Sequence, residues 1–556
     1  MYKLISLSNV GVEFGDKTVL KNVTFDVFEN DKIGIVGKNG AGKTTLIKAI
    51  LAAISPTSGS INVMADKLII GYLKQITDYN NINTDTEIIQ ESISNFYQTT
   101  SEIKVGEKVN VDFEQLSGGE KTKIALAKVL CKNPNLLILD EPTNHLDFDG
   151  INWLIDTLKA YNGTLLVISH DRFFLDKVTN KTIEVDRGEV KVFQGNYSAY
   201  KDQKQHQTLE NWNCYSKQEK KKKEINMEIN RLKNWSNTSW RKAGKQSDMR
   251  GTKAHYRKSA KKIDDRVKSK IKKLEKIDLE GVEKPWEEGQ IKFDFAADFK
   301  KNKRILEVSN LSKGYSGADL FKNNSFYLNR GEKVALIGPN GCGKTTLLKL
   351  INQTEQPDIG TIWISPSATF SYLSQDVTDL EENITPLEYL NAKSGRRRSI
   401  AQTTLANLGV DSAAVTNQIK NLSMGERTKV KLVNIILNSC DFLILDEPTN
   451  HLDIANKEQL EQALKDFEGT LILVSHDRYL VENTCDIALE IKDNKIIKNL
   501  SPWKSQTKLS QQQMDKTLLE TKISEVLSKL SDSLPDSEEY QQLDLQFKEL
   551  VKLRNN

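Results

Sequence analysis

Two glycine-rich loops, each ending in Gly-Lys-Thr-Thr, are the residues of this chain best suited to chemistry. The glycines let backbone N–H groups converge on phosphate oxygens, and the lysine reaches the β- and γ-phosphates of a nucleotide. The two lysines lie 301 positions apart, so the loop is present once in each half of the chain. The residues that we expect to contact the nucleotide are Gly37, Asn39, Gly40, Gly42, Lys43, Thr44 and Thr45 in the first loop and Gly338, Asn340, Gly341, Gly343, Lys344, Thr345 and Thr346 in the second.

Three further segments follow each loop in the same order and at matched spacing. The serine of an LSxGE segment precedes an acidic glutamate by 24 positions in both copies, and that glutamate precedes a histidine by 29 positions. Chance does not duplicate four motifs in this way, so the chain has two nucleotide sites and is driven by ATP. The segments are LSGGE (116–120), LLILDEPTNHLD (136–147) and SHDR (169–172) in the first copy, and LSMGE (422–426), FLILDEPTNHLD (442–453) and SHDR (475–478) in the second.

These segments add side chains with definite chemical tasks. An aspartate that ends an apolar strand binds Mg²⁺ together with the loop threonine, directly or through water, and a glutamine after another strand senses the γ-phosphate and the metal. The next glutamate accepts a proton from the attacking water, while the histidine hydrogen-bonds the γ-phosphate. Phe14 and Tyr315 precede the second strand of each half, where a ring can stack on adenine. The predicted catalytic residues are Glu141, Glu447, His170 and His476, and the predicted metal ligands are Thr44, Gln75, Asp140, Thr345, Gln375 and Asp446.

Alternating apolar strands and helices predict an α/β fold in each half, with a mostly parallel sheet covered by helices. An apolar strand over 33–36 enters the first glycine loop, and an amphipathic helix follows from Lys43. Strand, loop and helix in this order are the context in which such a loop binds phosphate. We therefore expect one nucleotide-binding domain over 1–200 and a second over 303–500.

The segment between these domains, residues 201–302, differs from both in charge. Residues 201–273 hold 23 lysines and arginines against 8 aspartates and glutamates, a net charge of +15, whereas the whole chain carries +4. A helix pair that is merely solvated would more often mix the two signs, so we favour contact with the phosphates of folded RNA. Lys220 to Lys223 and a second group over 261–273 supply the positive charge.

Apolar residues at helical spacing predict that residues 197–277 form two antiparallel helices, with a turn within 236–251. Their narrow apolar seam suits two helices that pack on each other and little else. The predicted seam consists of Leu209, Trp212, Tyr215, Ile225, Ile229 and Leu232 in the first helix and Ile263, Val267, Ile271 and Leu274 in the second.

The sequence over 507–556 predicts a second helical hairpin, with its turn at Asp532-Ser-Leu-Pro535. Leu518, Ile523, Val526 and Leu527 line its first arm. Leu543, Phe547, Leu550 and Leu553 line its second arm. This hairpin is either a short coiled coil that packs on the body of the protein or a contact with a ribonucleoprotein.

Composition narrows the class of protein. The chain is 38% hydrophobic and 28% charged, and its longest apolar runs are far shorter than the roughly 18 residues of a membrane helix. The N-terminus does not resemble a secretory leader, so we expect a cytoplasmic protein. Five cysteines without metal-binding spacing suggest reduced thiols, and four of the six histidines belong to the duplicated motifs.

The duplicated motifs resemble those of the ATP-binding cassette superfamily. That resemblance implies two cassettes that face each other head to tail, so that the LSxGE signature of one closes the nucleotide site of the other. Residues 37–45 would then pair with Ser423 and Gly425, and residues 338–346 with Ser117 and Gly119. A transporter ATPase needs a membrane domain, and a chromosome-type ATPase carries its coiled coil inside one cassette. A soluble RNA-directed factor fits the chain better.

LDEPTNHLD in both cassettes, a basic hairpin between them and the sequence QGNYSAY (194–200) resemble the ABC-F translation factors over residues 1–500. The resemblance implies a monomer with paired cassettes that binds the 70S ribosome and its 23S rRNA at the tRNA exit site when ATP closes the cassettes. It also implies that the hairpin reaches the P-site tRNA and the peptidyl-transferase centre.

Within this family the chain is most similar to factors that protect ribosomes from pleuromutilins, lincosamides and streptogramin A. Gln75 precedes Ser117 by 42 residues, and Gln375 precedes Ser423 by 48. The first interval therefore has no room for the arm of housekeeping members such as the translational throttle. A housekeeping factor that relieves stalled ribosomes is the alternative. Residues expected at the hairpin tip to stack on bases or hold phosphates, or else to pack the hairpin, are Trp235, Trp240, Arg241, Lys242 and Lys245.

Overall fold

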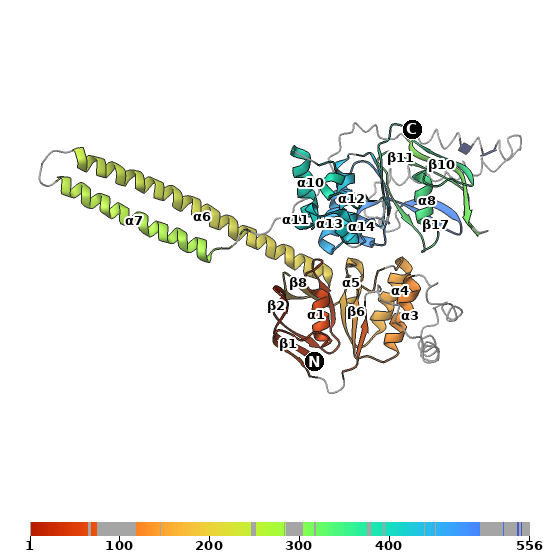
Figure 1. Ribbon diagram of the computed structural model, residues 1–556, viewed down its shortest axis with the longest axis horizontal. Helices are drawn as coiled ribbons and strands as arrows, with labels where there is room; N and C mark the ends of the chain where they lie inside the picture. The colour runs from red at the N-terminus through yellow and green to blue at the C-terminus, as the bar shows by residue number, and fades with distance from the viewer. Residues whose placement is uncertain are drawn as a thin grey trace. The chain divides into compact units, whose positions relative to one another are not determined.

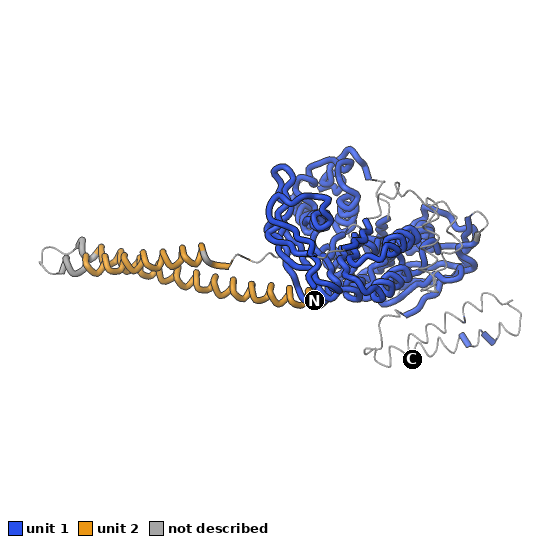
Figure 2. The backbone as a smooth tube through the Cα atoms, turned by 90° about the horizontal axis from the view of Figure 1, so that it is seen from below, with its two compact units in different colours: residues 1–197, 289–556 blue, residues 198–288 orange. Residues whose placement is uncertain are grey.

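The glycine loops and the acidic motifs follow strands of two similar six-stranded sheets, one in each half of the chain (Figure 1). The chain divides into two compact units, residues 1–197 with 289–556 and residues 198–288 (Figure 2). The first unit contains both cassettes, and the second contains the basic segment. The structure is a computed structural model that describes residues 2–64, 68–74, 118–144, 146–245, 252–282, 284, 304–315, 318–374, 380–392, 395–438, 440–450, 452–500, 526, 542–543 and 546–547.

The first cassette consists of strands and helices in alternation. They are β1 (Lys3–Phe14), β2 (Lys17–Phe28), β3 (Lys32–Val36), α1 (Lys43–Ile50), β4 (Ser58–Val63), β5 (Ile70–Leu73), α3 (Gly118–Leu130), β6 (Leu136–Asp140), α4 (Phe148–Ala160), β7 (Thr164–Ile168), α5 (Arg172–Val178), β8 (Lys181–Asp186) and β9 (Glu189–Gln194). The strand order is β5-β6-β7-β3-β8-β9 in the main sheet, parallel except for β8 with β9, and β2-β1-β4 in an antiparallel sheet. This arrangement confirms the predicted α/β class.

The second cassette repeats this plan. Its elements are β10 (Arg304–Tyr315), β11 (Ala318–Asn329), β12 (Lys333–Ile337), α8 (Lys344–Ile351), β13 (Ile359–Ile364), β14 (Phe370–Leu373), α9 (Pro386–Tyr389), α10 (Gly395–Asn407), α11 (Ser412–Thr416), η3 (Ile419–Asn421), α12 (Met424–Leu437), β15 (Phe442–Asp446), α13 (Ile454–Asp466), β16 (Thr470–Val474), α14 (Arg478–Thr484), β17 (Ile487–Lys492) and β18 (Lys495–Leu500). Its sheets have the orders β14-β15-β16-β12-β17-β18 and β11-β10-β13. Each strand therefore has a counterpart in the first cassette.

Buried central strands explain why the acidic residues stand where they do. Strands β6 and β7 are buried at every position, as are β15 and β16, which accounts for their continuous apolar sequences. Each of β6 and β15 ends at an aspartate, and the glutamate predicted to be catalytic follows as the next residue. The edge of the sheet where these strands end is therefore the place where polar side chains can leave the core.

The second unit is a pair of long antiparallel helices, α6 (Tyr197–Lys245) and α7 (Thr252–Glu280), which run side by side in both views (Figures 1 and 2). Its buried seam consists of Ile225, Ile229 and Val267, with Leu232, Ile271 and Leu274 packed against it. The predicted seam is confirmed at these positions.

The seam prediction is wrong at Leu209, which is 60% exposed. The helix pair ends before this residue, because Gln218 of α6 accepts a hydrogen bond from the backbone N of Val282, just beyond α7. Lys222 also pairs with Asp278 at 2.6 Å, close to that end. Leu209 therefore lies where α6 has no partner helix in the hairpin.

The far end of α6 continues as helix through Lys245, so Trp235, Trp240 and Arg241 lie on its last turns rather than in the turn between the helices. Both tryptophans are about half exposed, at 53% and 45%. Nε1 of Trp240 donates to Asp264 of α7 at 3.4 Å, and Arg231 lies 4.9 Å from the centre of the Trp235 ring. Trp240 thus takes part in hairpin packing while keeping an exposed face. The predicted side-chain roles of Lys242 and Lys245 lie outside the described side chains.

Among the helices that the structure describes, none combines the length and the apolar composition needed to cross a membrane. The predicted C-terminal hairpin over 507–556 lies almost wholly outside the described residues.

Candidate nucleotide-binding sites

Each glycine loop leads directly into a helix, and a glycine in a left-handed conformation makes that entry possible. Gly42 precedes α1 with φ of 106°, and Gly343 precedes α8 with φ of 101°. A Cβ at Gly343 would approach the ring of Phe321 to 2.8 Å, and one at Gly42 would approach Leu20 to 3.0 Å. Only glycine combines this backbone with this close approach, so both loops can direct the first N–H groups of the helix toward an anion.

The loop lysines lie across their own loops. Nζ of Lys43 donates to the carbonyl oxygens of Gly37 and Lys38, at 2.8 and 3.0 Å. Nζ of Lys344 donates to those of Gly338 and Pro339, at 2.8 and 3.1 Å. Burial lowers the pKa of Lys43, although Glu141 opposes the shift. Both ammonium groups are therefore placed where phosphate oxygens would arrive.

A threonine hydroxyl and a carboxylate meet beside each loop. Oγ1 of Thr44 donates to Oδ2 of Asp140 at 3.5 Å, and Oγ1 of Thr345 donates to Oδ2 of Asp446 at 3.3 Å. Hydroxyl and carboxylate oxygens are hard ligands, and Mg²⁺ prefers a few of them together with phosphate and water. The donor set therefore fits Mg²⁺ in both sites.

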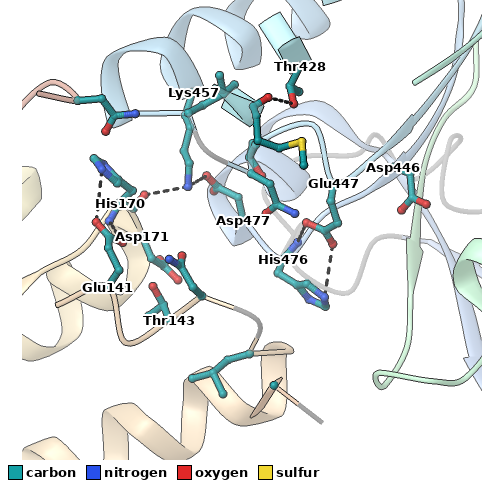
Figure 3. Close-up of a pocket in the computed structure, with 18 of the residues that line it drawn as sticks. Glu141, Thr143, His170, Asp171, Thr428, Asp446, Glu447, Lys457, His476 and Asp477 are labelled. Atoms are coloured by element: carbon teal, nitrogen blue, oxygen red, sulfur yellow. Dashed lines mark hydrogen bonds and ion pairs between the residues drawn. The ribbon is translucent and has the colours of Figure 1, made fainter. Parts of the chain in front are cut away.

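The two glutamates predicted to be catalytic face the histidines of the SHDR segments in both cassettes (Figure 3). Nε2 of His170 lies 3.3 Å from Oε1 of Glu141, and Nε2 of His476 lies 3.4 Å from Oε1 of Glu447. The backbone N of each histidine donates to the other carboxylate oxygen, at 3.2 and 3.4 Å. Each glutamate has a positive φ, 51° for Glu141 and 49° for Glu447. A strained backbone therefore presents the carboxylate at the end of the strand.

Burial shifts the protonation of these pairs in a direction that suits proton transfer. It raises the pKa of Glu141 to about 7 and that of Glu447 to about 8, the latter with help from Asp446. Burial also lowers the pKa of His170 well below its usual value and that of His476 to about 4. Neutral imidazoles and carboxyls that titrate near neutrality are what a base-catalysed attack of water requires.

Some polar atoms of the two Glu–His pairs remain available to a ligand. Among the residues that the structure describes, Oε1 of both glutamates and Nδ1 of both histidines are buried without a hydrogen-bond partner of suitable geometry. Buried polar groups in native proteins are nearly always satisfied. A γ-phosphate and its attacking water would supply the missing partners.

Each loop is also contacted by the other cassette, through aspartates that the sequence analysis did not select. Oδ2 of Asp453 accepts from the backbone N of Asn39 at 3.3 Å, and Oδ2 of Asp147 accepts from that of Asn340 at 3.3 Å. The second oxygen of each aspartate caps a helix, α13 or α4. The signal that could have revealed them is an aspartate directly before an amphipathic helix, the usual N-cap.

The second signature begins α12, and its final glutamate has a structural role. Ser423 and Glu426 form a capping box, in which Oγ of Ser423 accepts from the backbone N of Glu426 at 3.3 Å. Gly425 lies in the first turn of this helix, and Gly119 lies in the first turn of α3. Ser117, Gln75 and Gln375 lie outside the described residues.

The two aromatic residues predicted to stack on adenine lie at the ends of β1 and β10. Phe14 is 51% exposed and Tyr315 is 44% exposed. The hydroxyl of Tyr315 donates to Glu355, and Lys313 lies 5.4 Å from the ring centre. Together with both loops and both Glu–His pairs, these rings line a cleft of about 1550 Å³. The structure thus places most of the described nucleotide-site candidates from both cassettes around one cleft. The described nucleotide-site candidates that do not line it are Gly37, Gly119, Gly338, Ser423 and Gly425.

Comparison with known proteins matches most of the chain. Residues 20–144 and 321–450 match the family model described as ABC transporter, and residues 183–295 match a second model of the same description. The ribosome protection protein VmlR of Bacillus subtilis is 41% identical, over 99% of this chain and 98% of its own length. ABC transporter F family member 5 of Arabidopsis thaliana is 30% identical, over 88% of this chain and 75% of its own.

The translational throttle protein EttA of Mycobacterium tuberculosis is 28% identical, over 87% of this chain and 90% of its own length. Among solved structures, an archaeal ribosome recycling factor in complex with a ribosomal stalk protein aligns with a TM-score of 0.58. That alignment covers 92% of each chain at 16% identity, so it supports the fold alone.

Proposed function

Since this chain belongs to the ABC-F family of paired ATP-binding cassettes and is an ATPase, we propose that it acts on the ribosome. The observation that carries the proposal is the 41% identity over nearly the whole chain to a protein named for ribosome protection. In this proposal the chain works in the cytoplasm as a monomer, and its two cassettes pair within one polypeptide.

The nucleotide sites supply the switch in this proposal. ATP and Mg²⁺ bind at the two loops, and the signature of the opposite cassette completes each site. Mg²⁺ is held by Thr44 and Asp140 in the first site and by Thr345 and Asp446 in the second, where it neutralises charge on the phosphates. Glu141 and Glu447 accept a proton from the attacking water, and hydrolysis releases the closed state.

The hairpin supplies the contact with RNA. Of the four consecutive lysines, Lys220, Lys221 and Lys223 are exposed. Most of the basic residues of α7 are exposed as well, including Lys261, Lys262 and Arg266. Exposed cations of this kind neutralise phosphates and bind RNA without regard to sequence, with affinity that falls as salt rises. We propose that the ATP-closed chain binds 23S rRNA at the tRNA exit site of the 70S ribosome and directs this hairpin toward the P-site tRNA.

A finer proposal concerns drug protection. In it, the hairpin end with Trp235, Trp240 and Arg241 enters the peptidyl-transferase centre, where pleuromutilins, lincosamides and streptogramin A bind, and the drug is released. The name of the Bacillus subtilis relative supports this role. The similarity to EttA instead supports the alternative, a housekeeping factor that relieves stalled ribosomes without drug protection.

Cell-free bacterial translation inhibited by a pleuromutilin, a lincosamide or a macrolide tests these proposals. We expect the chain with ATP to restore synthesis with the first two drugs and not with the macrolide. The double variant Glu141→Gln with Glu447→Gln should sediment with ribosomes in ATP and block translation. Failure of that variant to sediment would exclude the ribosome, while sedimentation without rescue from any drug would favour the housekeeping role.

The hairpin end needs its own variants. Trp240→Ala and Arg241→Ala should keep ribosome sedimentation and lose drug rescue. Lys272→Gln with Lys273→Gln is a matched control for lost charge away from the hairpin end, because the neighbouring Lys270 pairs with Glu228, and it should weaken sedimentation at high salt instead. If Trp240→Ala and Arg241→Ala leave both sedimentation and rescue intact, the proposed position of the hairpin end is wrong.

A further inference from the structure

Helices α4 and α13 differ where the two cassettes meet. Each has 13 residues and begins after an aspartate cap, Asp147 or Asp453, so their positions correspond one to one. Ile151, Asn152 and Ile155 of α4 correspond to Lys457, Glu458 and Glu461 of α13. One copy therefore presents isoleucines where the other presents a cation and a carboxylate.

The charged residues of α13 hold Arg172, the first residue of α5 in the other cassette. Nη2 of Arg172 donates to Glu461 at 2.6 Å and to Oδ1 of Asp477 at 3.4 Å, and Nη1 lies 3.7 Å from Glu458. The Arg172 side chain is only 4% exposed. A buried guanidinium among carboxylates is costly to separate, because loss of either partner leaves an uncompensated charge. Arg172 therefore ties the first cassette to α13 of the second.

Lys457 extends this charge cluster into the first nucleotide site (Figure 3). Its Nζ donates to the backbone O of His170 at 3.1 Å and lies 3.9 Å from Oδ2 of Asp477. The backbone N of the same histidine donates to Glu141. A lysine of the second cassette thus holds the residue that contacts the catalytic glutamate of the first.

Equivalent contacts cannot form around the second site. Ile151 has no donor that could hold the carbonyl of His476, and Ile155 has no charge to offer Arg478. Arg478 instead donates to Glu482 of its own helix at 2.7 Å, with its side chain 39% exposed. Phe148 packs edge-on against His476, with ring centroids 5.9 Å apart. The Tyr479 hydroxyl also donates to Asp176 of the first cassette at 2.7 Å, and Arg478 lies 4.5 Å from the centre of the Phe173 ring. The second site therefore has contacts of its own with the opposite cassette, but no counterpart of the Lys457 hydrogen bond to the histidine backbone.

We propose that Lys457 and Arg172 are positioning residues that act more strongly on the first nucleotide site than on the second. They hold the His170 segment from the opposite cassette through its backbone, whereas at the second site they meet only the side chain of Asp477, next to His476. Hydrolysis at Glu141 therefore depends on the charge cluster more than hydrolysis at Glu447 does. The inference rests on ATP hydrolysis and not on the proposed ribosome function. It is therefore tested on the purified full-length chain without ribosomes, where failure of the ribosome proposal has no influence.

Lys457→Met is the decisive variant, measured in two backgrounds that each disable one site. With Glu447→Gln, only the first site hydrolyses, and kcat should fall on the order of tenfold while KM changes little, because a displaced catalytic group slows the step more than it weakens binding. With Glu141→Gln, kcat should fall by no more than about twofold, because Lys457 makes no hydrogen bond to the backbone of His476 that matches the one to His170. Lys457→Arg should restore activity. Lys465→Met, an exposed lysine in the last turn of the same helix, is the matched control that should affect neither background.

Equal losses in both backgrounds, or a loss that Lys457→Arg does not restore, would overturn the proposal. If Lys457→Met does not fold, Glu461→Gln loosens Arg172 and is measured in the same way. If neither single-glutamate background turns over, 8-azido-ATP labelled on the α- or the γ-phosphate resolves the sites. Lys457→Met should raise the retained γ-to-α ratio more on peptides of the first cassette than on those of the second, and an equal rise on both cassettes would again overturn the proposal.

Discussion

Around their catalytic glutamates, the two nucleotide sites match contact for contact. The Glu–His distances are 3.3 and 3.4 Å, and the lysine-to-loop hydrogen bonds and the opposing aspartates are duplicated as well. One layer further out, Lys457 reaches the first site, whereas the matching Ile151 cannot donate to the second. The loop lysines, glutamates and histidines are thus the same in both sites, and the groups that hold them in place are not.

This difference teaches that a duplicated site can diverge without changing its chemistry. The two cassettes can each cleave ATP by the same steps and still respond differently to a change at their interface. Four predictions test the shared and the divergent parts of this comparison.

The largest effect is expected for Glu141→Gln with Glu447→Gln. Glutamine cannot accept the proton of the attacking water, and general base catalysis contributes about 10²–10⁴-fold, so kcat should fall by that order. Steady-state phosphate release measures it. Glu189→Gln, an exposed glutamate at the start of β9, is the control and should retain full activity. Turnover that persists in the double variant would mean that the shared chemistry does not run through these carboxylates.

The next largest effect is expected at Phe14 and Tyr315, the rings predicted to stack on adenine. Phe14→Ala removes a face on which adenine can stack, and because stacking on an aromatic ring is worth roughly 1–3 kcal/mol, KM for ATP should rise about tenfold. Tyr315→Phe removes only the hydroxyl that donates to Glu355 and should keep KM within about twofold. Nucleotide titration of both variants checks the prediction. A large rise in KM for Tyr315→Phe would show that the Tyr315 hydroxyl contributes to ATP binding, which Phe14 cannot do.

A smaller effect concerns stability and pH. The pKa of Glu447 is raised to about 8 and that of Glu141 to about 7. Between the ordinary pKa of a glutamate and these raised values, each carboxyl is protonated in the folded chain and ionised in the unfolded chain. Stability should therefore fall as pH rises from about 4.5 toward 8 for Glu447 and toward 7 for Glu141, because the unfolded state binds fewer protons. A glutamine in place of either glutamate does not ionise, so it removes that residue's share of the loss of stability at high pH.

Thermal melting of the nucleotide-free chain at pH 5, 7 and 8.5 measures that effect. Glu447→Gln should melt above the unsubstituted chain at pH 8.5 and close to it at pH 5, with roughly 2–4 °C for each kcal/mol in a domain of 150–250 residues. Glu141→Gln should reach its full gain at lower pH than Glu447→Gln. A gain that does not vary with pH would show that packing, and not ionisation, separates the variants.

The smallest effect is expected for Met424→Gly, which makes the second signature equal to the first. Met424 is 51% exposed at the first position of α12, so its loss costs little packing, and a glycine there costs less than about 1 kcal/mol. Activity should stay within about twofold of the unsubstituted chain. A tenfold loss would place this methionine among the residues that close the site.

The sequence predicts what each cassette does by itself and fails where the cassettes meet. The glycine loops and the glutamates after β6 and β15 follow from motifs whose parts lie close together in a βα unit. Asp453 and Lys457 contact residues 414 and 287 positions away, and no local periodicity encodes such a distance. Leu209 was misassigned for a related reason, because helical spacing does not reveal where the partner helix ends.

The positive φ of Glu141 and Glu447 bears on how such a protein evolves. A left-handed backbone costs a residue with a side chain roughly 1–2 kcal/mol, and glycine or asparagine would tolerate it better. A cassette that no longer needed catalysis would gain stability from either replacement, so drift would remove the glutamate readily. Both halves of this chain carry the glutamate at this strained position, which is the pattern expected if selection for hydrolysis acts on both sites.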